Sequence, residues 1–409
     1  MPDTPSVGCG SSATRLIRDR TTWLHYAQLG ALGYFQFGFG SSVLLFREES
    51  GVSRTVAGMY GPALAVGTIA GGVLFPHLTR RLPLGVVLTI GLTGLAVGAG
   101  MFCLSSSVTG TLLATVIAMT FGILVLSGVS TGLSDHHGTI SAAAISEANA
   151  ASAGMGFLAP LLTKVAVDAG MGWRAALGLT FVLAGTLAAL TASTRWRSPA
   201  DSNKVAVQRD STGKHLPRRF WLAWSCLLAI ESVEAGLILW AAEQLHERTG
   251  VSADTAGIAV SAVLGGMLVG RLGAARVAVR IANVPLMFGA IATAAAGFAV
   301  FWLATEPAIA LAGLLCCGLG MSLHFPLSVA LTMEASNQQF ELAMSRNSYG
   351  VAFGFGVAPF LLGALSDLLG IRWAFCLVPC CLFAAALSLG QLARLQRQDR
   401  VEVSAPTAM

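Results

Sequence analysis

Twelve long apolar segments constrain the fold of this chain more than any other feature of the sequence. A helix that spans a lipid bilayer needs about 20 mainly apolar residues. Isolated strands cannot satisfy their backbone polar groups in lipid, and the segments lack the alternating pattern of a membrane barrel. We therefore expect an all-α membrane protein with twelve spans at Trp23–Phe46, Val56–Leu78, Leu84–Leu104, Thr111–Leu133, Ile140–Val167, Trp173–Thr194, Phe220–Leu245, Thr255–Val277, Val284–Ala304, Ala308–Met333, Tyr349–Leu369 and Trp373–Leu392.

The shortage of charge supports a membrane protein. Only 11% of the 409 residues are charged, whereas soluble domains carry about 25%. A surface that faces hydrocarbon needs no charge, and the 47 glycines suit the close packing by which membrane helices associate. The net charge of +5 comes from basic residues scattered over short loops, so we expect no nucleic-acid partner.

A polar stretch from Arg195 to Arg219 divides six apolar segments from six others. It lacks an apolar period, so we interpret it as a cytoplasmic linker between two bundles. The predicted organisation is a cytoplasmic tail at 1–22, a six-helix bundle at 23–194, the linker at 195–219, a second six-helix bundle at 220–393 and a cytoplasmic tail at 394–409.

The two halves share an internal repeat. When the first half is shifted by 199 residues, several short features coincide, which chance does not readily explain across five helices. Duplicated helical units are a known transporter design, with the solute site near the membrane midplane between the halves. The coinciding features are Gly51-Val52-Ser53 with Gly250-Val251-Ser252, Ala57-Gly58 with Ala256-Gly257, Arg81 with Arg280, Ala159-Pro160 with Ala358-Pro359, and Asp168 with Asp367; Trp23-Leu24 coincides with Trp221-Leu222 at a shift of 198.

Lysine and arginine predict the orientation, because loops rich in these residues stay in the cytoplasm. With the N-terminus inside, the inner segments carry 18 of them and the outer loops carry 5, while Lys164 and Arg271 remain within spans. We therefore expect a multi-pass protein of the plasma (inner) membrane with both termini in the cytoplasm. The five outer residues are Arg47, Arg54, Arg174, Arg248 and Arg372.

Six plus six helices, a basic linker and an internal repeat resemble the major facilitator superfamily over residues 20–395. The loop between the second and third spans resembles the family signature Gly-x-Leu-x-Asp-Arg-x-Gly-Arg-Arg. The resemblance implies two pseudo-symmetric six-helix bundles, a monomer, and a gating role for the two arginines of this loop. The signature is matched at Gly72, Leu74, Arg80 and Arg81, whereas Pro76 occupies the acidic position and Thr79 the second glycine.

The fifth span bears on one branch of this family. Exporters of the superfamily often carry Gly-x-x-x-Gly-Pro-x-x-Gly-Gly there, but the stretch from Gly156 to Pro160 lacks the trailing glycines. The first span also contains no acidic residue. Both features disfavour a multidrug exporter, which remains an alternative because the fold alone names no substrate.

Ionisable residues within the spans are costly in lipid and are therefore candidates for function. Glu231 and Glu234 share one face of the seventh span, roughly 18 and 22 Å into the helix. At the 198-residue shift Glu234 corresponds to Gln36 in the first span. The resemblance implies that these two spans line the cavity, so we predict a site for solute or a coupling ion there. The alternative is that either glutamate only neutralises Arg271.

Arg271 lies roughly 13 Å into the eighth span and needs a partner there. Glu147 lies at a similar depth in the fifth span, and the resemblance implies that these spans pack across the interface between the bundles. We hypothesise a Glu147–Arg271 pair that closes the cytoplasmic side and opens during transport. The alternatives are a static pair with Glu231 or the binding of an anionic solute by Arg271.

The remaining candidate is His324, near mid-depth in the tenth span, which either titrates and binds solute or packs as a core residue. The sequence contains no phosphate-binding Gly-x-x-x-x-Gly-Lys loop and no Ser-His-Asp arrangement, so we expect neither an enzyme nor ATP-driven transport. The eight cysteines lack metal-ligand spacing, and we expect no metal or other cofactor.

These features predict a secondary active transporter that moves a small organic solute by alternating access, driven either by protons or by the solute gradient. Two rivals remain: a multidrug exporter of the same family, and a membrane sensor or channel. Drug sensitivity on deletion would favour the exporter. Solute binding without flux would favour the sensor, and flux without saturation would favour the channel.

Overall fold

The computed structural model describes residues 18–194, 215–278 and 280–404, which form helices joined by short turns. Most of the predicted tail at 1–22 and of the predicted linker at 195–219 lies outside the described residues. Within the described ranges there is no strand, and twelve helices or helix pairs are long and apolar enough to cross a membrane. The predicted all-α class and its twelve spans are confirmed.

Six spans precede the linker and six follow it. The first six consist of α1 (Arg20–Ser50), α2 (Arg54–Gly58) with α3 (Tyr60–Thr79), α4 (Leu84–Leu104), α5 (Val108–His137) followed by the 3-10 turn η1 (Gly138–Ile140), α6 (Ser141–Asp168) and α7 (Trp173–Ser193). The last six consist of α8 (Arg218–Thr249), α9 (Ala253–Ala256) with α10 (Ile258–Ala278), α11 (Asn283–Leu303), α12 (Pro307–Met321) with α13 (His324–Glu334), α14 (Phe340–Leu369), and α15 (Ile371–Ala374) with α16 (Leu377–Ser404).

Local sequence explains where several helices begin and end. The hydroxyls of Ser53 and Ser107 accept backbone hydrogen bonds and cap the helices that follow them. Gly51 and Gly250 end α1 and α8 with φ of 63° and 71°, a left-handed conformation that glycine adopts without steric cost. These two glycines coincide in the sequence repeat, so both bundles end their first helix in the same way.

Some spans are interrupted. Met59 separates α2 from α3, and Gly257 separates α9 from α10 at nearly the same place in the repeat. In the tenth span, α12 and α13 meet at Ser322 and Leu323, whereas α5, the equivalent helix of the first half, is continuous. The tenth span therefore carries a junction that the repeat does not predict.

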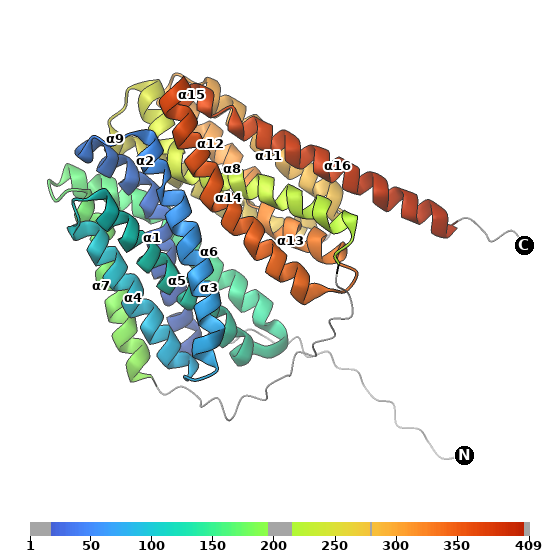
Figure 1. Cartoon of the computed structure of the whole chain (residues 1–409), viewed down its shortest axis with the longest axis horizontal. Coiled ribbons are helices and arrows are strands. Elements are labelled where there is room, and N and C mark those ends of the chain that lie inside the picture. The colour runs from blue at the N-terminus through green and yellow to red at the C-terminus, as the bar shows by residue number, and fades with distance from the viewer. Residues whose placement is uncertain (1–17, 195–214, 279, 405–409) are drawn as a thin grey trace, which may run out of the picture.

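The helices form two bundles that converge around α2, α9 and α15 and diverge toward the ends at which α1 and α8 begin (Figure 1). We call the side on which α1 and α8 end the far side, and the side on which they begin the terminal side. The most apolar windows of α1 and α8 are 83% and 61% buried, the highest value of each bundle. Outer side chains such as Leu104, Leu272 and Leu368 are exposed, which suits contact with lipid.

Most helices are longer than the predicted spans. The bounds of α4 agree with the prediction, but α1 continues to Ser50 and α8 to Thr249. The start of α14 is Phe340 rather than Tyr349, and α16 reaches Ser404, inside the predicted C-terminal tail. Hydropathy detects only the apolar part of a helix, so polar turns at its ends are missed.

Candidate functional site

The two bundles meet along a seam of three helix pairs: α1 with α8, α2 and α3 with α14, and α6 with α10. Glycines permit close approach at this seam. A Cβ on Gly40 of α1 would lie 2.1 Å from the carbonyl oxygen of Ile238 on α8, so only glycine fits the crossing. A Cβ on Gly61 of α3 would similarly lie 3.0 Å from the carbonyl oxygen of Gly356 on α14.

A buried carboxylate joins the bundles on the far side. Glu243 of α8 has a side chain only 2% exposed and pairs with Arg47 of α1 at 2.7 Å and with Arg54 of α2 at 2.6 Å. Arg54 also pairs with Glu247, one turn further along α8. We call these four residues the far-side cluster. A carboxylate removed from water needs such partners, so separating the bundles here would leave Glu243 without compensation.

Further polar contacts cross the seam beside this cluster. Asp367 of α14 accepts hydrogen bonds from the backbone amide and the hydroxyl of Thr55, at 2.7 and 2.6 Å, and so caps α2 from the other bundle. Lys164 of α6 pairs with Asp168 of its own helix at 2.5 Å and with Asp254 of α9 at 3.0 Å. Asp168 and Asp367, which coincide in the repeat, therefore lie at equivalent places of the seam.

In the described part of the chain, the ion pairs that join the two bundles lie on the far side. Beyond the contacts above, the bundles are joined by the hydroxyl of Ser261, which donates to the carbonyl of Phe157 at 2.8 Å, and by His246 and Glu48 at 3.3 Å. Within the described ranges, every ion pair between the bundles lies on this side, whereas the Ser261–Phe157 hydrogen bond lies near mid-depth, because Gly156 beside Phe157 contacts Phe37 of α1. The diverging helix ends in Figure 1 agree with a state that is open on the terminal side.

Gln36 and Glu234 lie at matching depth, one from each bundle. Gly40, one turn after Gln36, touches Ile238, one turn after Glu234. Both polar side chains are partly exposed, and both precede the Gly40–Ile238 crossing by one turn, on its terminal side. In the described structure neither makes a side-chain hydrogen bond, which leaves an amide and a carboxylate available to a ligand.

Glu231 and Arg271 add charge beside Glu234. Glu231 is 3% exposed, its Oε1 has no hydrogen-bond partner in the described structure, and it packs against Gly354 of α14. Glu231 interacts electrostatically with Glu234, and so does the exposed Arg271 of α10. We therefore treat Glu231, Glu234 and Arg271 together as candidate residues of one charged site.

Glu147 has other partners in this state. Its carboxylate accepts hydrogen bonds from Arg18 at 2.6 and 2.9 Å and from the hydroxyl of Tyr26 at 2.9 Å, all within the first bundle. The side chains of Arg18 and Glu147 are 50% and 35% exposed. A pair so exposed is screened by water and contributes little to stability. The Glu147–Arg271 contact stays a prediction for a state in which the terminal side is closed.

The other predicted residues lie apart from this group. Arg80 and Arg81 are exposed at the end of α3 and form no side-chain hydrogen bond or ion pair with the rest of the described chain. His324 is 1% exposed, and neither ring nitrogen has a hydrogen-bond partner of normal geometry among the described residues. Its ring lies beside the backbone of Ala290.

A polar group surrounds the start of α1. Asp19 hydrogen-bonds with His136 at 2.8 Å and accepts from the amide and hydroxyl of Thr22 at 2.9 and 2.7 Å. Partial burial opposes ionisation of Asp19, but these hydrogen bonds outweigh it and hold the pKa of the carboxyl below its usual range. The described residues contain no cluster of three His, Cys, Asp or Glu side chains that could hold a metal ion.

The far-side cluster was not predicted from the sequence, in which Arg47 and Arg54 entered only as outer charges. A signal was nevertheless present. Glu243 lies inside the predicted span Phe220–Leu245, and an acid within a span needs a partner. Arg47 and Arg54 follow the first span on the same side of the membrane and were the available cations.

Comparison with known proteins agrees with this architecture. The model of the Major Facilitator Superfamily matches residues 30–336 and 230–408, which together include almost the whole chain. Among proteins with curated descriptions, none matches the chain in sequence.

Several solved structures have a similar fold. A peptide transporter, POT, in complex with sulfate has a TM-score of 0.71 at 13% identity, over 92% of this chain and 94% of its own. The nucleoside transporter NupG has a TM-score of 0.70 at 14% identity, over 90% and 99%. A bacterial homologue of the human lysosomal transporter Spinster, in an inward-facing and unoccupied conformation, has a TM-score of 0.67 at 16% identity, over 91% and 92%. These identities establish the fold alone; with the family match, they show that the chain is a multi-pass membrane protein that belongs to the major facilitator superfamily.

Proposed function

We propose that the chain is a secondary active transporter that moves a small organic solute across the plasma membrane by alternating access. The observation that carries this proposal is the position of Gln36 and Glu234 at one depth beside the closed crossing. A solute bound there touches both bundles, so its binding free energy depends on their arrangement. The nucleoside and peptide transporters of similar fold support a small polar solute.

The charged group of the second bundle supplies a means of coupling to protons. Glu231 is buried without a hydrogen-bond partner for Oε1 and lies close to a second carboxylate, Glu234. Binding of a proton would remove one of these two negative charges and change the electrostatic balance with Arg271. We propose Glu231 and Glu234 as the coupling residues, with Arg271 as the group that balances Glu234 or meets an anionic part of the solute.

In a transport cycle the contacts between the bundles on the far side must open, and contacts on the terminal side must form. Opening of the far side separates Glu243 from Arg47 and Arg54. Closure of the terminal side would bring the start of α6 close to the end of α10. Glu147 would then leave its present partner Arg18 and pair with Arg271. Because the Arg18 pair is exposed and weak, this exchange costs little. Arg80 and Arg81 lie on the same side and are proposed to contribute to this gate.

The remaining features of the proposal follow from the sequence. The excess of lysine and arginine in alternate loops supports cytoplasmic termini, so the described state would be open to the cytoplasm. The bundles at 23–194 and 220–393 are the proposed moving units, and a single chain contains both halves of the site. We therefore propose a monomer, with protons and a small solute as its partners.

Uptake into proteoliposomes tests the function. Purified protein is assayed with labelled sugars, nucleosides and short peptides, with and without a pH gradient. We expect saturable uptake of one class, reduced at least tenfold by Gln36→Ala and by Glu234→Gln because each removes a proposed solute contact. Gln391→Ala, exposed on α16, should leave uptake unchanged. Binding without flux, or flux that does not saturate, would reject the transporter.

A charge exchange tests the gate separately. Glu147→Arg and Arg271→Glu should each reduce uptake, whereas the double variant should restore it because the opposite charges again meet when the terminal side closes. Arg18→Gln is the control for loss of the present partner of Glu147 and should retain most uptake. A double variant that folds normally but stays inactive would reject the Glu147–Arg271 gate.

A further inference from the structure

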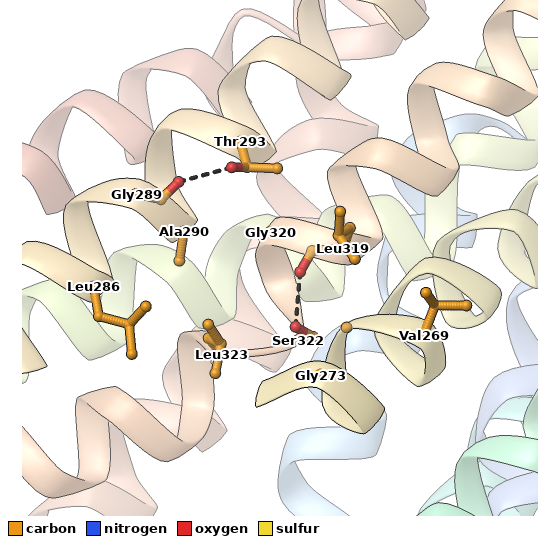
Figure 2. A pocket seen from close by; sticks show the side chains of 11 residues that line it. Val269, Gly273, Leu286, Gly289, Ala290, Thr293, Leu319, Gly320, Ser322 and Leu323 are labelled. Carbon is orange, nitrogen blue, oxygen red and sulfur yellow. Dashed lines mark hydrogen bonds between the residues drawn. The ribbon is translucent and has the colours of Figure 1, made fainter. Parts of the chain in front are cut away.

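A pocket of about 320 Å³ lies in the second bundle, outside the seam. It is bounded by α10, α11 and the junction of α12 with α13 (Figure 2). α11, which forms one wall, packs against α12, α13 and α16 of its own bundle. The pocket is therefore separate from the proposed solute site between the bundles.

The pocket offers a ligand almost only apolar contacts. Gly273 of α10 and Gly289 of α11 line it, and a Cβ built on either would meet no atom within 4 Å. The two hydroxyls in the lining are already satisfied, because Ser322 donates to the carbonyl of Leu319 at 2.7 Å and Thr293 to the carbonyl of Gly289 at 2.9 Å, as Figure 2 shows. A ligand here must be apolar.

The rim of the pocket is also apolar. Val269 and Leu319, which line it, are 57% and 38% exposed. In a membrane protein such side chains meet hydrocarbon. An apolar hollow that opens to hydrocarbon is filled by lipid chains, because its walls offer no hydrogen bonds to water.

A positive charge lies at the terminal-side end of α10 and α11, the two helices that form opposite walls of the pocket. The turn between α10 and α11 exposes Arg280. Gly273 is five residues before the last residue of α10, Ala278, so the pocket begins roughly 8 Å from this turn. Glu334, an acid at this end of the bundle, accepts a hydrogen bond from Asn283. A phosphate at Arg280 would thus lie at the membrane surface with its acyl chain directed toward the pocket.

We propose that this pocket binds an acyl chain of an anionic phospholipid whose phosphate contacts Arg280. Ser322 and Leu323, the residues that join α12 to α13, form part of its wall. An occupying chain therefore supports the tenth span at its one interruption, at a place where the equivalent α5 needs no support.

Photo-crosslinking tests the pocket. The full chain is placed in nanodiscs that contain phosphatidylglycerol with a diazirine on one acyl chain, and labelled residues are identified by mass spectrometry. We expect labels to concentrate on the pocket walls relative to exposed apolar residues of the first bundle. Gly289→Leu should reduce wall labelling at least fivefold by filling the space. Gly185→Leu on α7, where a Cβ also meets no neighbour, is the matched control and should change nothing.

The headgroup is tested with the same label on phosphatidylcholine. The wild-type pocket should favour phosphatidylglycerol, and Arg280→Gln should remove this preference while chain labelling persists. Equal labelling of the wild type by both lipids would overturn the anionic assignment, and unchanged wall labelling in Gly289→Leu would overturn the pocket. Thermal unfolding verifies each variant, and Gly273→Leu replaces Gly289→Leu if that variant does not fold.

Discussion

At the scale of single residues, the far-side cluster contains the most strongly enclosed ion pair of the seam. Glu243 is 2% exposed, whereas its partners Arg47 and Arg54 are 18% and 20% exposed. The carboxylate is therefore the member of the cluster that has lost its water, and the arginines keep part of theirs. A change at Glu243 should matter more than one at Glu247, whose side chain is 47% exposed.

We predict that Glu243→Gln destabilises the described state strongly. The amide cannot compensate two arginines, and breaking a buried pair costs about 3–5 kcal/mol. Thermal unfolding of the purified protein should show a marked decrease in Tm. Glu247→Gln is the matched control on the same helix, expected to cost about 0–1 kcal/mol. Equal losses in the two variants would show that burial of Glu243 is not what stabilises the cluster.

The sequence predicted part of this residue-level arrangement. Gln36 and Glu234 were placed at matching depth from the repeat, and the glycine crossing one turn away is compatible with that placement. Glu243 was overlooked because its partners lie outside the spans, and a count of loop charges says nothing about which of them reach back into the seam. The present partners of Glu147 were also not predictable, because Arg18 lies in the polar tail before α1.

At the scale of helices, the crossing of α1 and α8 depends on one small residue. The Cβ of any other residue at position 40 would lie against the backbone of Ile238. The partner is a backbone atom, so no side chain can rotate away to relieve the clash. The two helices must separate if Gly40 is replaced.

We predict that Gly40→Ala shifts the protein away from closure on the far side. Spin labels at the far ends of α1 and α8 should show a longer distance in pulsed electron paramagnetic resonance. Gly236→Ala, on α8, is the control because its Cβ would meet Leu362 at an ordinary 3.5 Å. An unchanged distance in Gly40→Ala would mean that the crossing is not a constraint on closure.

Helix existence was predictable from hydropathy, and helix interruption was not. The apolar segments are long enough to be recognised without any tertiary information. The junction between α12 and α13 lies just before Pro326, whose nitrogen cannot donate a hydrogen bond to the carbonyl of Ser322, but mean hydropathy does not detect this break. The polar turns at the ends of α1 and α8 were likewise missed, although they carry Arg47 and Glu247.

At the scale of the whole molecule, the charges on the far side are segregated between the bundles. In the far-side cluster and the Lys164–Asp254 pair, the first bundle supplies the cations and the second supplies the anions. Among the ion pairs between the bundles in the described residues, the pair of His246 with Glu48 has the reverse sense. The two bundles therefore attract each other at one end of the seam. The two-bundle architecture was predictable from the repeat, but this polarity required the three-dimensional pairing.

We predict that salt weakens closure on the far side. The Debye length falls from about 10 Å at 0.1 M to about 3 Å at 1 M, so exposed members of the segregated pairs lose attraction. The distance between spin labels on the far ends of α1 and α8 should lengthen as salt increases. Glu247→Gln should respond less, because it has already lost the exposed anion of the cluster, whereas salt screens the pairs of the buried Glu243 only weakly. A salt response of equal size in both proteins would refute this electrostatic account.

Because these pairs lie on one side of the molecule, its conformational equilibrium depends on the ionic strength on that side of the membrane. If the termini lie in the cytoplasm, the segregated charges meet the external medium, whose ionic composition the cell does not control. An external medium of low ionic strength would then favour the state that is open to the cytoplasm. A medium of high ionic strength would favour opening of the far side, before any solute binds.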